Sequence, residues 1–333
     1  MNESATRPSF GPSHQFPMTF GQVFDRTFRL MRDNLRLLLG VAAVPCIAIF
    51  LVIGAIFGFM FVELGPQIAN QDAKPPAIDP YTFTIFICAV YLILPLIYAL
   101  YMPAASYAAT QANLGVAPTF REAYSVAWRR FWRSLWLMIL SILFTLVPVV
   151  ACALIIGLVI LLLHLALGEG SGGTMDLALI PPGMLLFIAA QVCSILIMLR
   201  ISLAYPACVV EELPAWSSLK RSMQLTKGAK GRIFLMLLVV YALGYALSLA
   251  CMAISFAVGS LVAFVAILSH VAEGSTAFYV LIGLAVLGYV LVVIVTCLFT
   301  YAAFTTALAV LYYDQRLRKD GQLPAPSQAG EHA

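Results

Sequence analysis

The sequence predicts an all-α, polytopic membrane protein with six transmembrane helices, arranged as three repeats of an amphipathic helix followed by a transmembrane hairpin. Of its residues, 62% are hydrophobic and 10% are charged, whereas about a quarter of the residues of a soluble domain are charged. The mean hydropathy is +0.97. Six apolar runs each exceed the roughly 20 residues that cross a bilayer: 37–62, 81–110, 135–167, 184–210, 233–268 and 277–311.

An amphipathic helix is expected over about 18–36, directly before the first apolar run. Aromatic residues recur there every four positions, on one face of a helix: Phe20, Phe24 and Phe28. Arg29 lies on the polar side, and Thr19 with Gln22 forms the pattern of a capping box. An aromatic face bordered by arginine is typical of a helix lying in a membrane surface.

The same pattern returns a hundred residues later, and a single surface helix is predicted over 119–136. Its aromatic residues and arginine are Phe120, Tyr124, Trp128, Arg129 and Trp132, behind a second capping box at Thr119 and Glu122. A shorter stripe begins at Trp216. These starts predict a threefold internal duplication, with repeats over about 18–115, 118–212 and 214–320.

The basic residues predict the orientation. All but two of the 19, Lys74 and Arg200, fall on one side of the predicted spans. The positive-inside rule places that side in the cytoplasm, together with both termini. Residues 1–17 and 321–333 are expected to be disordered cytoplasmic tails, because they are rich in polar residues and proline. The outer loops carry an excess of acidic residues: Glu63, Asp72, Asp79, Glu169, Asp176 and Glu273.

Two stretches carry a resemblance to a known family. The first runs from Arg200 through Pro206 and Glu211 to the Leu219-x-Arg221-Ser222 and Leu225-Thr226-Lys227-Gly228 motifs. The second is Leu311-Tyr312-Tyr313-Asp314-x-Arg316-x-Arg318-Lys319. Over nearly all of 18–320, the chain resembles bacterial six-span proteins related to the membrane domain of glycerophosphoryl diester phosphodiesterase. The resemblance implies a multi-pass protein of the bacterial inner membrane. The catalytic barrel of the full-length enzyme has no counterpart here, so the resemblance does not imply its activity.

No catalytic or metal-binding pattern stands out. The four histidines do not form an HExxH pair, and no Cys/His/Asp cluster has zinc spacing. All seven cysteines fall within apolar runs, where they are expected to act as small apolar side chains. We therefore expect a protein that is not an enzyme, has no cofactor or metal, and does not bind nucleic acid.

Polar residues near the cytoplasmic ends of the spans form the candidate site: Arg200, Glu211, Arg221, Ser222, Lys227, Lys230, Tyr313, Asp314 and Arg316. On one interpretation they are structural anchors, and Arg200 extends its side chain to the interface. On the other, Arg200 and Arg221 bind a lipid phosphate, for which the planar guanidinium group is suited. Glu211 and Asp314 then pair with neighbouring arginines.

Three functions follow from these patterns. The first is a non-catalytic membrane protein whose basic cytoplasmic face engages phospholipids, anionic ones in particular, or a protein partner. The alternative is a transporter of a lipid-like or small amphiphilic substrate, because internal repeats and prolines within spans are features of transporters. An intramembrane enzyme is least favoured, because no nucleophile and base occur in a recognisable pattern.

Overall fold

The computed structural model describes residues 18–69, 80–116, 118–167, 172–268 and 276–321, all helices and short turns, with no strand among them. Six of the helices are long and apolar enough to cross a membrane. They form three hairpins: α2 (Leu35–Ala69) with α3 (Pro80–Asn113), α5 (Phe131–Leu167) with α6 (Gly172–Ile201), and α9 (Lys230–Leu268) with α10 (Thr276–Asp320). The predicted tails and most of the predicted outer-loop acids lie outside the described residues.

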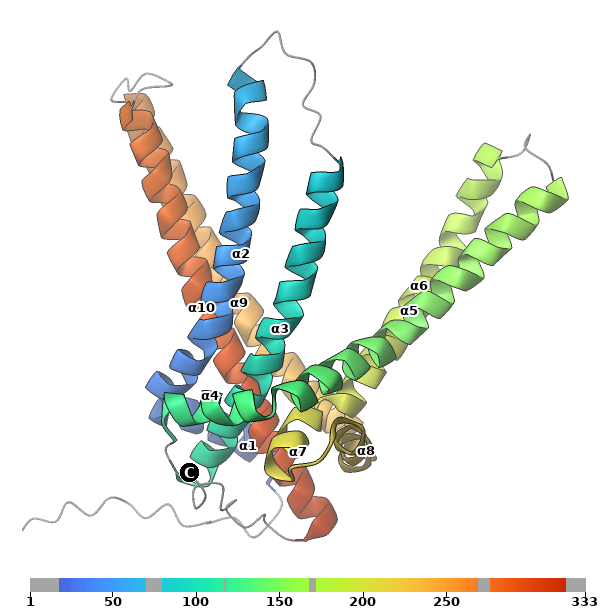
Figure 1. Cartoon of the computed structure of the whole chain (residues 1–333), viewed down its shortest axis with the longest axis vertical. Coiled ribbons are helices and arrows are strands. Elements are labelled where there is room, and N and C mark those ends of the chain that lie inside the picture. Colours follow the sequence, from blue (N-terminus) through green and yellow to red (C-terminus); the bar gives the residue numbers. More distant parts are fainter. Residues whose placement is uncertain (1–17, 70–79, 117, 168–171, 269–275, 322–333) are drawn as a thin grey trace, which may run out of the picture.

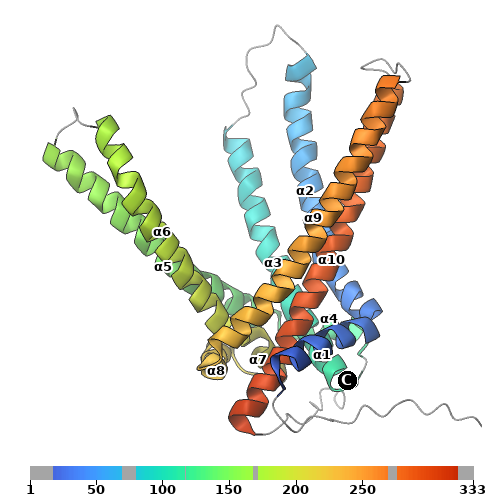
Figure 2. The same cartoon turned by 180° about the vertical axis from the view of Figure 1, so that it is seen from behind.

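Four short helices gather where the three hairpins converge (Figure 1). They are α1 (Phe20–Asp33), α4 (Phe120–Arg129), α7 (Ala204–Val210) and α8 (Ala215–Thr226). We call this part of the molecule the basic end; it comprises these helices and the adjoining ends of the six long ones. The hairpins diverge as they leave it, and α5–α6 leans furthest from the other two in both views (Figures 1 and 2). Contacts between hairpins are therefore concentrated at the basic end.

Both predicted capping boxes are present, at Thr19 with Gln22 and at Thr119 with Glu122. However, the single helix predicted over 119–136 is wrong, because α4 ends at Arg129 and α5 begins at Phe131. The chain turns here from lying across the basic end to leaving it. The side chain of Arg130 holds the turn by donating hydrogen bonds to the Val209 carbonyl and to Glu212.

Three other predicted boundaries also differ. The fourth apolar run is two helices, since α6 ends at Ile201 and α7 begins at Ala204. Pro206 lies in the first turn of α7, where backbone N–H groups make no hydrogen bond within the helix. The absence of an N–H in proline therefore costs α7 no hydrogen bond. Helix α6 begins at Gly172 instead of residue 184, and α10 continues past Leu311 to Asp320, so the charged residues after Leu311 are helical.

Small side chains allow the helices of the basic end to pack closely. One core cluster consists largely of alanines from α2, α3, α4 and α10: Ala42, Ala104, Ala105, Ala108, Ala109, Ala123, Ala127, Ala302 and Ala309. Small residues let the backbones of membrane helices approach one another, which increases their van der Waals contact. Alanine at these positions therefore determines how closely α4 and α10 lie against α3.

We expect Ala108→Leu to destabilise this packing, because Ala108 is fully buried and a larger side chain must displace a neighbouring helix. The loss should be about 1–3 kcal/mol, measured as a lower thermal unfolding temperature in detergent. Ala189→Leu is the matched control, because Ala189 is exposed on α6. Equal stability of the two variants would contradict the packing described here.

Candidate functional site

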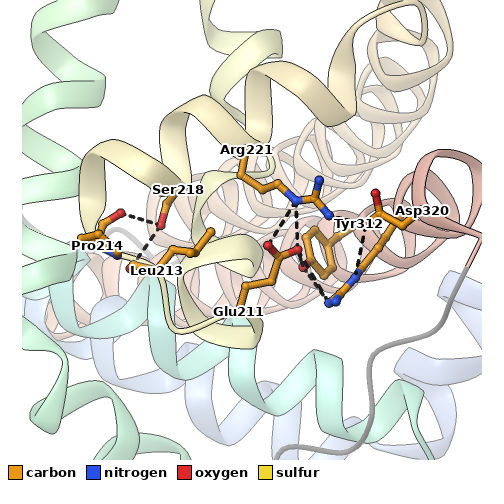
Figure 3. Close-up of polar contacts among 8 residues, drawn as sticks. Glu211, Leu213, Pro214, Ser218, Arg221, Tyr312 and Asp320 are labelled. Carbon is orange, nitrogen blue, oxygen red and sulfur yellow. Dashed lines mark hydrogen bonds and ion pairs between the residues drawn. The ribbon is translucent and has the colours of Figure 1, made fainter.

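The first polar cluster joins α7, α8 and α10 through Glu211 (Figure 3). Its carboxylate accepts hydrogen bonds from Arg221 Nε at 3.1 and 3.2 Å and from the Tyr312 hydroxyl at 2.7 Å. Arg221 also pairs with Asp320, and Arg316 lies 3.7 Å from both Glu211 and Asp320. Two arginines and two carboxylates thus form a closed and electrically balanced network.

The electrostatics of Arg221 follow from this network. Partial burial of its guanidinium opposes the charged form, but the hydrogen bonds and negative charges of Asp320 and Glu211 outweigh burial and raise the pKa of Arg221. The side chain is 22% exposed. Arg221 is therefore a charged connector between helices, with its donors directed at protein carboxylates.

The second cluster surrounds Asp314, whose side chain is fully buried. It accepts a hydrogen bond from the Met18 backbone N–H at 2.9 Å and pairs with Arg318 at 3.0 Å and Arg232 at 3.3 Å. The same two arginines donate to the Met18 carbonyl, Arg318 at 2.6 Å. Both backbone groups of Met18 are thus bonded, and this residue, two positions before α1 begins, is fixed to the start of α9 and the end of α10.

Ser222 closes the break between α6 and α7. Its hydroxyl donates to the Arg200 carbonyl at 2.7 Å and accepts from the Leu203 N–H at 3.2 Å. Thr226 donates to the same Arg200 carbonyl at 3.3 Å. A helix end leaves such backbone groups unpaired, so α8 stabilises the break by supplying the missing partners.

The remaining predicted site residues lie apart from these networks. Tyr313 is buried in the core and contacts Tyr312 edge to face, with ring centroids 5.6 Å apart. Within the described residues, the side chains of Arg200, Lys227 and Lys230 have no hydrogen bond or ion pair, and Arg200 and Lys227 are exposed. Of the predicted site residues, Glu211, Arg221 and Arg316 therefore belong to one network, whereas Asp314 and Ser222 make separate contacts. Arg200, Lys227 and Lys230 have no partner within the described residues.

The aromatic residues divide in a similar way. Phe20 and Phe24 pack partly against the core, and the Tyr124 hydroxyl donates to the Val41 carbonyl at 2.8 Å. Phe28, Phe120 and Trp216 are about half exposed. Trp128 is 70% and Trp132 78% exposed, and both lie near the exposed Arg129. On α1, Arg29 pairs instead with Asp25. Of the aromatic residues predicted to lie in the membrane surface, the most exposed are thus at the junction of α4 and α5, beside an exposed arginine.

The site predicted from the sequence left out several members of these networks: Met18, Arg130, Glu212, Arg232, Asp320, and Tyr312 and Arg318, which appeared only in the motif that carries the family resemblance. Only the helical spacing of Asp314 with Arg318 and of Arg316 with Asp320 was visible in the chain. Glu212 also has a positive φ of 53°, which is unusual for a residue with a side chain.

The fold and its charge distribution are those of a multi-pass helical membrane protein with one strongly basic end. Comparison with protein-family models, with curated proteins and with solved structures found no match to this chain. No group of histidine, cysteine and carboxylate side chains suited to a metal ion occurs among the described residues.

Asp314→Asn should strongly destabilise the protein, because it leaves Arg232 and Arg318 without their buried counter-charge. Removing one partner from a buried ion pair costs about 3–5 kcal/mol. The matched variant is Asp320→Asn, whose carboxylate is 31% exposed and should cost about 1 kcal/mol. Unfolding in a denaturing detergent measures both, and a larger effect at Asp320 would contradict the central place of Asp314.

Proposed function

We propose that this chain is a non-catalytic membrane protein whose basic end binds anionic phospholipid. One observation carries the proposal: each carboxylate described at the basic end already contacts an arginine or caps a helix, whereas many basic side chains have no carboxylate partner. The engaged carboxylates are those of Asp25, Asp33, Glu122, Glu211, Glu212, Asp314 and Asp320. Within the described residues, the basic side chains without a carboxylate partner are Arg26, which bonds to Asn113 instead, and Arg36, Arg121, Arg129, Arg133, Arg200, Lys220, Lys227, Lys230 and Lys319.

This division changes which residues we assign to lipid phosphate. Arg221 already donates to two carboxylates, so a phosphate must displace a protein contact to reach it. Arg129 and Arg133 are exposed, and among the described residues the only hydrogen bond of Arg133 is to the Glu212 carbonyl, at 3.5 Å. We therefore assign phosphate binding to these two arginines and to Arg200, and a structural role to Arg221.

The tryptophans beside these arginines support a position at the membrane surface. Trp128 and Trp132 are more than two-thirds exposed, and tryptophan is enriched where the hydrocarbon meets the headgroups. There its ring is buried among lipid chains and its N–H remains hydrated. A basic residue near an anionic leaflet contributes about 1 kcal/mol of attraction. Aromatic and basic groups side by side thus match a phospholipid headgroup region.

The orientation and evolutionary origin form part of the same proposal. The positive-inside rule favours a cytoplasmic basic end with both termini on that side, and the family resemblance favours the bacterial inner membrane. The three hairpins follow α1, α4 and α8 in the same order, and α1 and α4 share a capping box. This order supports descent from a triplicated unit.

A transporter of a lipid-like or small amphiphilic substrate is the second candidate. The divergence of the hairpins above the basic end favours it (Figures 1 and 2), because motion of one helical unit against another underlies alternating access. Flux of a fluorescent phospholipid in proteoliposomes would identify transport. Release of a water-soluble product from labelled phospholipid would instead identify an enzyme.

Combined replacement of Arg129 and Arg133 by Gln should reduce the preference for phosphatidylglycerol over phosphatidylcholine roughly 30-fold, since each cation contributes about 1 kcal/mol. The measurement is the ratio of the two lipids retained by the purified protein in native mass spectrometry. The control is Arg29→Gln with Arg32→Gln, because these arginines are already paired with carboxylates. An unchanged ratio in the first variant would remove the basis of the proposal.

Cysteine introduced as Arg121→Cys should react with a membrane-impermeant maleimide only after the cytoplasmic side is made accessible. The position is exposed at the basic end, and the native cysteines fall within the predicted spans. The unsubstituted chain gives the background. Labelling of intact bacterial cells at position 121 would reverse the proposed orientation.

A further inference from the structure

One flank of α6 carries a regular row of exposed side chains with a carboxamide at its centre. Met184, Phe187, Gln191, Ile195 and Met198 recur at spacings of three, four, four and three residues. All five are exposed in the isolated chain. This is the heptad spacing with which one helix packs along another at a small crossing angle. We call this row the α6 seam.

The α6 seam is distinct from the face by which α6 contacts α5. Ala190 and Ser194 are buried, and the Ser194 hydroxyl donates to the Thr145 carbonyl on α5 at 2.9 Å. Gln191 follows Ala190, so its side chain points about 100° away around the helix. The partner helix of the hairpin therefore leaves the α6 seam uncovered.

Gln191 differs from the other polar side chains of the spans. Serine and threonine hydroxyls here commonly donate to a carbonyl four residues earlier in their own helix, as Ser248, Ser255, Ser260 and Thr300 do. The carboxamide of Gln191 has no hydrogen bond within the described part of the chain. Hydrocarbon offers no partner to such a group.

Gln191 lies too deep in the membrane for water to form hydrogen bonds with its carboxamide. It lies nine residues from Arg200, or about 13 Å along the helix, and the hydrocarbon core is roughly 30 Å thick. With Arg200 at the interface, Gln191 is near the middle of the bilayer, too deep for its short side chain to reach the headgroups.

We propose that the α6 seam is a dimer interface occupied by the α6 seam of a second copy of this chain. Two copies inserted in the same orientation are related by a two-fold axis along the membrane normal, so each residue meets its equivalent at the same depth. A carboxamide is both a hydrogen-bond donor and an acceptor. Two facing glutamine side chains can therefore donate a hydrogen bond to each other. One polar group in an otherwise apolar seam also fixes the register of the pair.

The flanking residues fit this partner. Met184 and Met198 are unbranched and adapt to the shape of an opposing surface, and Phe187 and Ile195 lie on either side of Gln191. An unrelated protein could pair with Gln191 only if it carried an amide at the same depth. A second copy of this chain carries Gln191 at that depth by symmetry. The interface lies within the bilayer, so it leaves the basic end free to bind lipid.

The test is the dimer fraction of fluorescently labelled full-length protein in phosphatidylcholine liposomes, measured by single-molecule photobleaching over a series of protein-to-lipid ratios. The unsubstituted chain should dimerise as its density rises. Gln191→Leu should weaken dimerisation roughly 3- to 20-fold, the range of measured interhelical hydrogen bonds in membranes. Gln191→Asn, which keeps the amide, should weaken it less.

Ser260→Ala is the matched control, because Ser260 is exposed but bonds within its own helix; its dimer fraction should equal that of the unsubstituted chain. A monomer at every density, or a dimer unaffected by Gln191→Leu, would overturn the proposal. Phosphatidylglycerol retention of Gln191→Leu is measured in parallel and should be unchanged, which separates this interface from the lipid site at the basic end.

Discussion

The buried carboxylate of Asp314 is the interaction on which the arrangement of the basic end depends. It binds the backbone of Met18 and two arginines from different helices, and so fixes the first described residue against the last helix of the chain. A buried charge is tolerated only when it is fully paired. Because the hairpins diverge above this point (Figure 2), their relative positions are set mainly where such contacts exist.

The ion-pair networks have a second consequence, since they determine which cations remain free. Glu211 and Asp320 neutralise Arg221 and Arg316, while Arg130 is held by Glu212. Most of these carboxylates bond to arginines of other helices, so most of the remaining positive charge lies on exposed side chains. A protein that holds its helices together with part of its arginines can present the rest to a negatively charged surface.

The α5–α6 hairpin is little covered by the rest of the chain. The apolar window of α5 is only 6% buried within the chain, so the surfaces of the α5–α6 hairpin are available to lipid or to another helix. Lipid chains solvate apolar side chains well, but they offer no hydrogen-bond partner to a carboxamide. Gln191 therefore distinguishes one flank of the hairpin from the others, and the structure suggests separate roles for the bilayer interior and the basic end.

The sequence by itself determined the helical membrane class, the six long apolar helices and the two capping boxes, because hydropathy and helix capping are local properties. It also placed Glu211, Arg221 and Asp314 in one polar cluster, whereas in the structure Asp314 belongs to a separate network with Arg232 and Arg318. Only the tertiary structure decided that Arg221 is paired while Arg129 has no partner among the described residues, and that Ser222 bonds to the backbone at the break between α6 and α7. Its contacts link residues up to 300 positions apart, such as Met18 and Arg318. Local patterns carry no information on such pairing, because the partner of an arginine is chosen by how the helices pack.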